Sequence, residues 1–189
     1  SAFGLQIDSL ADVVSFGAAP ALLVYEWTLK RLGLTGLIVA FLFVACGAVR
    51  LARFNVLSMG ENGKPTKPSK YIVGLPIPGA AGILVAIIVA NHAVEGAIGR
   101  PEYAWGILAV TALLSFFMVS TIRFRSFKEV KHNVRTVLFV AFAIGSSVFI
   151  SMRMSPAFVL VWLLGFYILL GIFESLWQLP GRLMRRQRG

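Results

Sequence analysis

The fold of this chain is decided by residues 32–49, which read LGLTGLIVAFLFVACGAV. No charged side chain interrupts these 18 residues. About 20 residues of apolar α-helix are enough to cross the ~30 Å hydrocarbon core of a bilayer. A helix on the surface of a soluble domain would instead show a polar face that recurs every three to four residues. The stretch therefore predicts a transmembrane helix.

The composition of the whole chain agrees with this interpretation. Of its 189 residues 58% are hydrophobic and 14% are charged, and the mean hydropathy is +0.82. Soluble domains are about 45–50% apolar and about 25% charged. The net charge of +10 does not indicate a nucleic-acid partner, because the cations lie between apolar blocks rather than on one polar face. The single cysteine, Cys46, excludes an intrachain disulfide.

Apolar blocks long enough to span a bilayer occur six times. They are residues Val13–Leu29, Leu32–Val49, Leu75–Val94, Tyr103–Ile122, Thr136–Met152 and Pro156–Phe173. We therefore expect an all-α, polytopic transmembrane bundle of about six helices in residues 1–178, followed by a basic tail over residues 179–189. The polar stretch Ser58–Lys70 is expected to be a mobile loop.

The loop charges predict how the bundle is oriented. Fourteen of the 18 Lys and Arg residues fall in residues 50–70, 123–135 and 182–188, and the other four lie on the opposite side. The positive-inside rule puts the richer side in the cytoplasm. We therefore expect an integral protein of the cell or inner membrane, with both termini in the cytoplasm.

Aspartate occurs only at positions 8 and 12. On a helix this spacing puts both carboxylates on one face, with Cβ atoms about 5–6 Å apart. Two anions so close repel each other unless a cation lies between them, and Mg²⁺ and Mn²⁺ prefer carboxylate oxygens. Asp8 and Asp12 are therefore a candidate metal site. The alternative is that they are interfacial acids stabilised by the helix dipole.

Arg50 and Arg53 form a second ionisable pair, on one face at the end of the second apolar block. A guanidinium binds phosphate or carboxylate through two parallel hydrogen bonds. The alternative is that both arginines anchor the helix at the membrane interface. Asn55, just beyond them, would bind a polar ligand or cap the helix.

Three stretches together resemble one enzyme family. They are Gly4 with the spacing Gly-x-x-x-Asp-x-x-x-Asp that ends at Asp12, the segment CGAVRLARFN at residues 46–55, and GLPIP at residues 74–78. The first is similar to the second half of the signature of the CDP-alcohol phosphotransferases. All three together are similar to the phosphatidylserine synthase branch of that family, which uses CDP-diacylglycerol and L-serine.

The resemblance implies a reaction and a site. Asp8 would bind a metal, Asp12 would bind a metal and accept a proton from the acceptor hydroxyl, and Gly4 would make room for the cytidine nucleotide. Arg50, Arg53 and Asn55 would bind substrate. The cofactors would be two divalent cations, Mg²⁺ or Mn²⁺, the products phosphatidylserine and CMP, and the assembly a homodimer in the bilayer.

The first half of the family signature does not occur in the printed sequence. We therefore expect the chain to lack the N-terminal part, with six of about eight crossings present, and to hold an incomplete dinuclear site by itself. Three alternatives stay open. They are another acceptor (glycerol 3-phosphate or inositol phosphate), a membrane carrier or channel, and a lipid-binding protein without catalysis.

Overall fold

The computed structural model describes residues 2–58, 71–95 and 103–125, with short helical pieces at 145–147, 152, 158–159, 161–163 and 165–166. Most of the predicted spans Thr136–Met152 and Pro156–Phe173 lies outside the described residues. The predicted loop Ser58–Lys70 lies outside them except at its first residue, and the tail 179–189 lies outside them entirely.

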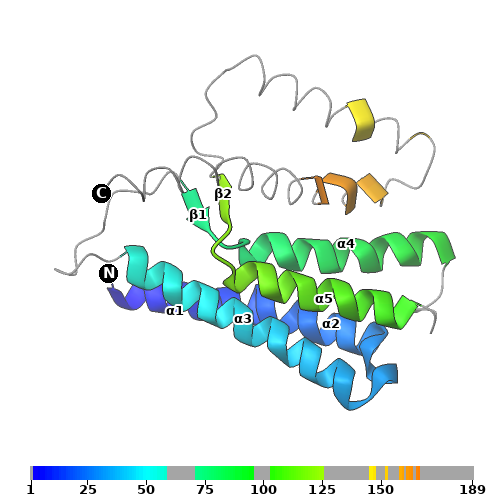
Figure 1. Cartoon of the computed structure of the whole chain (residues 1–189), viewed down its shortest axis with the longest axis horizontal. Helices are drawn as coiled ribbons and strands as arrows, with labels where there is room; N and C mark the ends of the chain where they lie inside the picture. The colour runs from blue at the N-terminus through cyan, green and yellow to red at the C-terminus, as the bar shows by residue number, and fades with distance from the viewer. Residues whose placement is uncertain are drawn as a thin grey trace, which may run out of the picture.

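The described chain is a bundle of helices, as the sequence predicts (Figure 1). The first long helix is built from α1 (Ala2–Asp12), the π-helical segment η1 (Val13–Ala18) and α2 (Ala19–Trp27). A short 3₁₀ turn, η2 (Leu29–Leu32), leads into α3 (Leu34–Ser58). The bundle is completed by α4 (Ile77–Glu95) and α5 (Ala104–Val119).

Four of the six predicted spans correspond to these helices. Residues Phe3–Trp27 and Leu34–Leu57 are long and apolar enough to cross a bilayer. The apolar parts of α4 and α5 are shorter, at Ile77–Ala93 and Ala104–Val119. The fourth block was predicted to continue to Ile122, but α5 ends at Val119 because the backbone at Ser120 is extended (ψ 160°).

The outer surface of the bundle is apolar. Phe41 on α3 is 72% exposed, and Trp105 and Phe116 on α5 are each 64% exposed. Soluble monomers rarely show contiguous apolar surface of this kind. Lipid tails are a favourable environment for these side chains, so the exterior supports the membrane-bundle fold.

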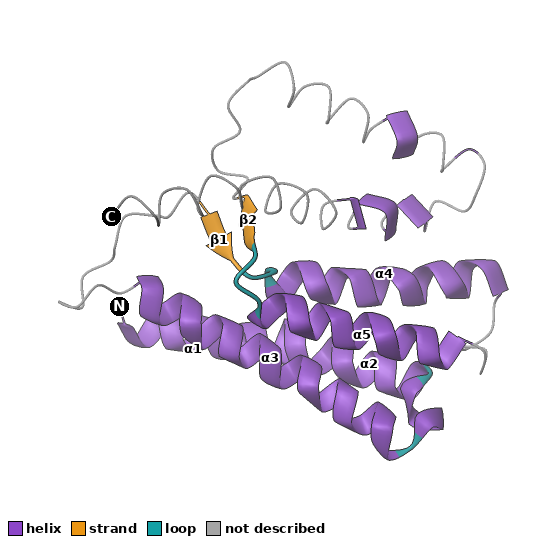
Figure 2. Ribbon diagram, viewed as in Figure 1, coloured by secondary structure: helices purple, strands orange, loops and turns teal. Residues whose placement is uncertain are grey.

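Neighbouring chain segments alternate in direction, so two ends of the bundle can be named. At the carboxylate end α1 begins, α3 and α5 end and α4 begins; at the far end lies η2 (Figure 1). Two strands that the sequence analysis did not predict, β1 (Tyr71–Val73) and β2 (Arg123–Arg125), pair antiparallel at the carboxylate end (Figure 2). Three-residue strands are too short to produce a recognisable alternation in the sequence.

The segment that follows β1 is held on the end of α5. Gly74 N–H donates to Ile122 O at 2.8 Å, and Leu75 N–H donates to Phe117 O at 3.0 Å. Gly74 has a φ of +80°, and a Cβ there would overlap the carbonyl oxygen of Met118. Only glycine adopts this backbone conformation without strain. Pro76 and Pro78 then start α4, where the missing proline N–H groups need no partner.

Ile77 is the point at which three helical segments meet. Its side chain is fully buried, and its Cδ1 lies 3.7 Å from where a Cβ on Gly17 would be and 2.6 Å from where one on Gly47 would be. Gly17 belongs to η1 and Gly47 to α3. Small residues at such contacts let helix backbones approach closely, which is the main source of helix association in lipid.

The far end carries an exposed ion pair. Lys30 Nζ lies 3.0 Å from Glu26 Oε2, and the hydrogen bond to Glu26 raises the pKa of the Lys30 ammonium above its ordinary value. Exposed pairs of this kind contribute little to stability. We therefore assign this ion pair a structural role. The candidate metal-binding and substrate-binding side chains lie at the carboxylate end.

Gly74→Ala should destabilise the fold more than Gly33→Ala. Both glycines have positive φ, so each substitution costs about 1–2 kcal/mol in backbone strain. Only Gly74 also faces a backbone oxygen, and that overlap should add about 1–3 kcal/mol. Thermal unfolding followed by circular dichroism in detergent micelles measures the difference, and equal losses for the two variants would contradict the docking of residues 74–75 on α5.

Candidate active site

The paired carboxylates lie on the first turns of the bundle, in α1. Asp8 is exposed and Asp12 is half-buried as the last residue of the regular α-helix. Gly4, Asp8 and Asp12 follow one another at four-residue spacing, so they form one stripe along α1. The structure confirms the predicted helical placement of all three residues.

The helix changes its winding directly after Asp12. Residues Val13–Ala18 are π-helical, and Ala19 N–H donates to Val14 O, five residues earlier. Single π turns occur often at functional sites, because they change the direction of the side chains on either side. Here the π turn separates the carboxylate stripe from α2.

Asn55 joins α3 to α1 beside this stripe. Its Nδ2 donates to Ser9 Oγ at 2.8 Å, and Ser9 Oγ donates to Leu5 O at 3.0 Å. Asn55 is only 7% exposed. Because Ser9 follows Asp8 directly and precedes Asp12 by three residues, this bond fixes the carboxylates relative to the end of α3.

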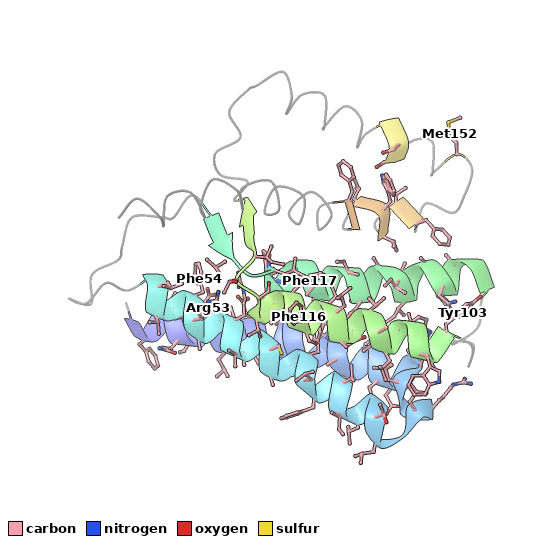
Figure 3. The ribbon with its side chains drawn as sticks, viewed as in Figure 1. Arg53, Phe54, Tyr103, Phe116, Phe117 and Met152 are labelled. Carbon is pink, nitrogen blue, oxygen red and sulfur yellow. The ribbon has the colours of Figure 1, made fainter. Side chains whose placement is uncertain are left out.

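Arg53 joins α3 to α5. Its Nη1 donates to Val119 O at 3.0 Å and its Nη2 to Ser120 O at 3.4 Å, at the end of α5 (Figure 3). The last carbonyls of a helix lack intrahelical partners, and a cation also interacts favourably with the negative end of the helix dipole. These contacts use two of the five guanidinium N–H groups.

Arg50 lies one turn earlier on α3. Its Cζ is 5.7 Å from the centroid of the Phe54 ring, a distance at which the cation is attracted to the aromatic face. The side chain is half-buried. Arg50, Arg53 and Asn55 thus lie at the same end of α3 but on different faces, with Arg53 bound to α5 and Asn55 bound to α1.

An open hollow of ≈ 380 Å³ lies between α1 and α3. Gln6, Ala52, Asn55 and Val56 line it. None of these four side chains carries a charge. The hollow therefore differs in chemical character from the carboxylate stripe on the same helix.

Asp8 and Asp12 supply suitable oxygen ligands for a hard divalent cation, but two carboxylates do not fill its coordination sphere. Mg²⁺ typically takes one or two carboxylates together with water and substrate phosphates. Within the described part of the chain, no three His, Cys, Asp or Glu side chains come together as a potential metal site. The two aspartates fit the ligand chemistry of a metal that is also held by substrate, and do not form a closed protein cage.

Residues 1–117 match the sequence model of the family described as CDP-alcohol phosphatidyltransferase. The chain belongs to this family. The matched region includes the carboxylate stripe, the arginine pair, α1 to α4 and α5 as far as residue 117. The expected family membership is confirmed.

The names of curated relatives from several organisms agree with this family membership. The chain is 36% identical to CDP-diacylglycerol–serine O-phosphatidyltransferase of Helicobacter pylori over 93% of its own length and 69% of that protein. It is 36% identical to the Bacillus subtilis protein of the same name over 68% of the chain and 62% of that protein. Identity to the archaetidylserine synthase of Methanothermobacter thermautotrophicus is 35%, over 65% of the chain and 45% of that protein.

Sequence analysis missed Ser9 and Gln6 as residues of this site. Neither residue type is distinctive on a helix, and no spacing links them to Asn55, which is 46 residues from Ser9. Only the side-by-side packing of α1 and α3 brings the three together. The α5 carbonyls that accept from Arg53 were missed for the same reason.

Arg53→Ala should destabilise the bundle, because it leaves the end of α5 without its charged donor. Hydrogen bonds from charged groups contribute about 1.5–3 kcal/mol, so we expect a loss in that range. Arg31→Ala is the matched control, since Arg31 is exposed at the far end and its removal should change stability by less than about 0.5 kcal/mol. Thermal unfolding in micelles compares the two, and similar small effects would show that Arg53 does not hold α5.

Proposed function

We propose that the chain transfers a phosphatidyl group from CDP-diacylglycerol to the hydroxyl of L-serine, as the catalytic part of a CDP-diacylglycerol–serine O-phosphatidyltransferase. The observation that carries the proposal is the stripe of Gly4, Asp8 and Asp12 on α1, joined through Ser9 and Asn55 to the arginine-bearing end of α3. The names of the similar proteins support the choice of substrates.

The reaction is a displacement at phosphorus. The serine hydroxyl oxygen bonds to the phosphorus that carries the diacylglycerol, and the bond from that phosphorus to the bridging oxygen of the pyrophosphate breaks. CMP leaves, and phosphatidylserine forms. Asp12 accepts the hydroxyl proton, a role that suits a carboxylate positioned within hydrogen-bonding reach of the acceptor.

Asp8 and Asp12 would hold divalent cations, Mg²⁺ or Mn²⁺, together with the pyrophosphate of the substrate. A bound cation would neutralise the charge that develops on the phosphate oxygens. The half-buried position of Asp12 next to exposed Asp8 suits this division, in which both residues bind metal and Asp12 alone takes the proton.

The remaining residues of the site would bind the substrates. Gly4, without a side chain at the start of the stripe, leaves room for the nucleotide. Arg50 is placed to bind an anionic group, either a phosphate or the serine carboxylate. Arg53 keeps three N–H groups beyond its bonds to α5 and would support the same anion, and Asn55 would contact the acceptor.

The bilayer is the proposed environment, and the carboxylate end is proposed to face the cytoplasm. This end carries Arg50, Arg53 and the strand residues Arg123 and Arg125, whereas Lys30 and Arg31 lie at the far end. We also propose a homodimer, as the family resemblance implies. The proposed domain covers residues 1–178, with residues 179–189 as a basic tail.

Asp12→Asn should lower serine-dependent CMP release by about 100-fold or more, because the amide cannot accept the proton. It should largely spare binding of CDP-diacylglycerol. Asp8→Asn should instead raise the Mn²⁺ concentration needed for the half-maximal rate. The assay follows radiolabelled serine into lipid with full-length protein in vesicles that contain CDP-diacylglycerol.

Glu26→Gln is the control for these two variants. It removes a carboxylate from the same long helix at the far end, where its ion-pair partner among the described residues is Lys30, and should leave the rate unchanged. A wild-type rate in Asp12→Asn would exclude Asp12 as the base. If glycerol 3-phosphate is incorporated in place of serine, the proposed phosphatidyl transfer is correct and the proposed acceptor is wrong.

The orientation is tested by labelling single cysteines in a Cys46→Ser background. A cysteine at Arg31 should react with a membrane-impermeant maleimide added to intact cells. A cysteine at Thr121, which is exposed beside β2, should react only after the membrane is opened. The reverse pattern would place the carboxylate end outside the cytoplasm.

A further inference from the structure

The side-chain amide of Asn55 has a hydrogen-bond partner at its nitrogen and none at its oxygen among the described residues. Its nitrogen donates to Ser9 Oγ, and its oxygen Oδ1 is buried with no hydrogen-bond donor in reach among the described residues. The residue as a whole is 93% buried, since 7% is exposed. Buried polar atoms are nearly always paired, so an unpaired acceptor at a site indicates a ligand.

Ser9 determines which end of the amide is free. A serine hydroxyl has a single proton, and Ser9 directs it to Leu5 O. In this hydrogen-bond arrangement Ser9 Oγ accepts from Asn55 Nδ2, and the carbonyl oxygen of the amide is the atom without a partner among the described residues.

The surroundings of Asn55 restrict the group that its oxygen can bind. Asn55 lines the hollow together with Gln6, Ala52 and Val56, and none of these carries a positive charge. A carbonyl oxygen repels phosphate and carboxylate groups and accepts from N–H and O–H groups. The ligand therefore presents a hydrogen-bond donor to Asn55, and its anionic groups lie elsewhere.

We propose that Asn55 Oδ1 binds the ammonium group of the acceptor L-serine, and so makes Asn55 a determinant of acceptor specificity. This inference rests on the proposed function. The serine hydroxyl is already assigned to Asp12, and the nucleotide to Gly4. Gly4 is five residues from Ser9, which places it roughly 140° around the helix from the Asn55 contact. With the hydroxyl at Asp12, the ammonium is the remaining hydrogen-bond donor of serine.

The geometry of α1 suits this arrangement. Asp12 is three residues beyond Ser9, so both lie on neighbouring parts of one helix surface, with Cβ atoms about 5–6 Å apart. The ammonium and the hydroxyl of serine are on adjacent carbon atoms. In the proposed arrangement the hydroxyl of serine lies at Asp12 and its ammonium at Asn55, which contacts Ser9 one turn earlier. The negative charge of Asp12 also favours the cation.

This contact would discriminate between acceptors. Glycerol 3-phosphate and inositol phosphate carry no ammonium group and bring a doubly charged phosphate. At Asn55 they would leave the amide oxygen unpaired. A site that hydrogen-bonds one substrate group strongly rejects analogues that lack it, because its own polar atom then stays unsatisfied.

The test measures KM for L-serine and for CDP-diacylglycerol with full-length protein in vesicles. Asn55→Leu should raise KM for serine by about 10- to 100-fold, the usual effect of losing a hydrogen bond to a charged group, and leave KM for CDP-diacylglycerol within about twofold.

Ser9→Ala is the matched control, because it removes the bond between α1 and α3 but keeps Oδ1. If Asn55 only ties the two helices together, Ser9→Ala and Asn55→Leu will change KM for serine equally, and the inference is wrong. A change confined to KM for CDP-diacylglycerol would also overturn it. If wild-type protein releases no CMP with serine, the proposed function itself fails, which is a separate result.

A measurement on wild-type protein covers the case in which Asn55→Leu does not fold. 3-Hydroxypropionate has the hydroxyl and carboxylate of serine but no ammonium. It should compete with L-serine at least about tenfold more weakly than unlabelled L-serine does. Competition of equal strength would show that the ammonium is not recognised.

Discussion

The close approach of three helical segments around Ile77 is the constraint on which the rest of the structure depends. Gly17 and Gly47 offer no side chain at this point, so the Ile77 side chain lies directly against η1 and α3. In a bilayer the lipid tails are as apolar as the protein, and helices are held by packing and hydrogen bonds rather than by the hydrophobic effect. The contact therefore sets how α1, α3 and α4 are positioned, and with them the carboxylates, the arginines and the start of α4.

Hydrogen bonds at the carboxylate end connect the helices further, in addition to the packing around Ile77. Arg53 binds the end of α5, and two residues later Asn55 binds Ser9 on α1. The end of α3 thus binds α5 on one face and α1 on another. Residues 74 and 75 add backbone bonds to α5. A rigid helix end is useful to an enzyme of this class, because carboxylates must be held in place for metal binding and proton transfer.

Much of the fold follows from the sequence because the local signals are strong. The apolar run at residues 32–49 predicts α3, and the spacing of Asp8 and Asp12 predicts their common face, which α1 provides. The family was found from three short stretches because their residue types and spacings are distinctive in combination. The ribbon of β1 and β2 was not predicted, since its paired residues are 50 or more positions apart along the chain and the strands have no period of their own. The π turn after Asp12 was not predicted either, because the sequence pattern of residues 13–18 does not distinguish it from an α-helix.

The sequence by itself determined the number and type of the long helices in the described region, the carboxylate pair and the family. These properties depend on composition and on spacing within one helix, which are local. Only the tertiary structure decided which partners the polar side chains take: Arg53 with the carbonyls of α5, and Asn55, which lines the hollow, with Ser9. Those partners are distant in the chain, and a side chain such as Arg or Asn suits many partners equally well. The choice is made by the helix packing, which brings one set within hydrogen-bonding distance and keeps the others away.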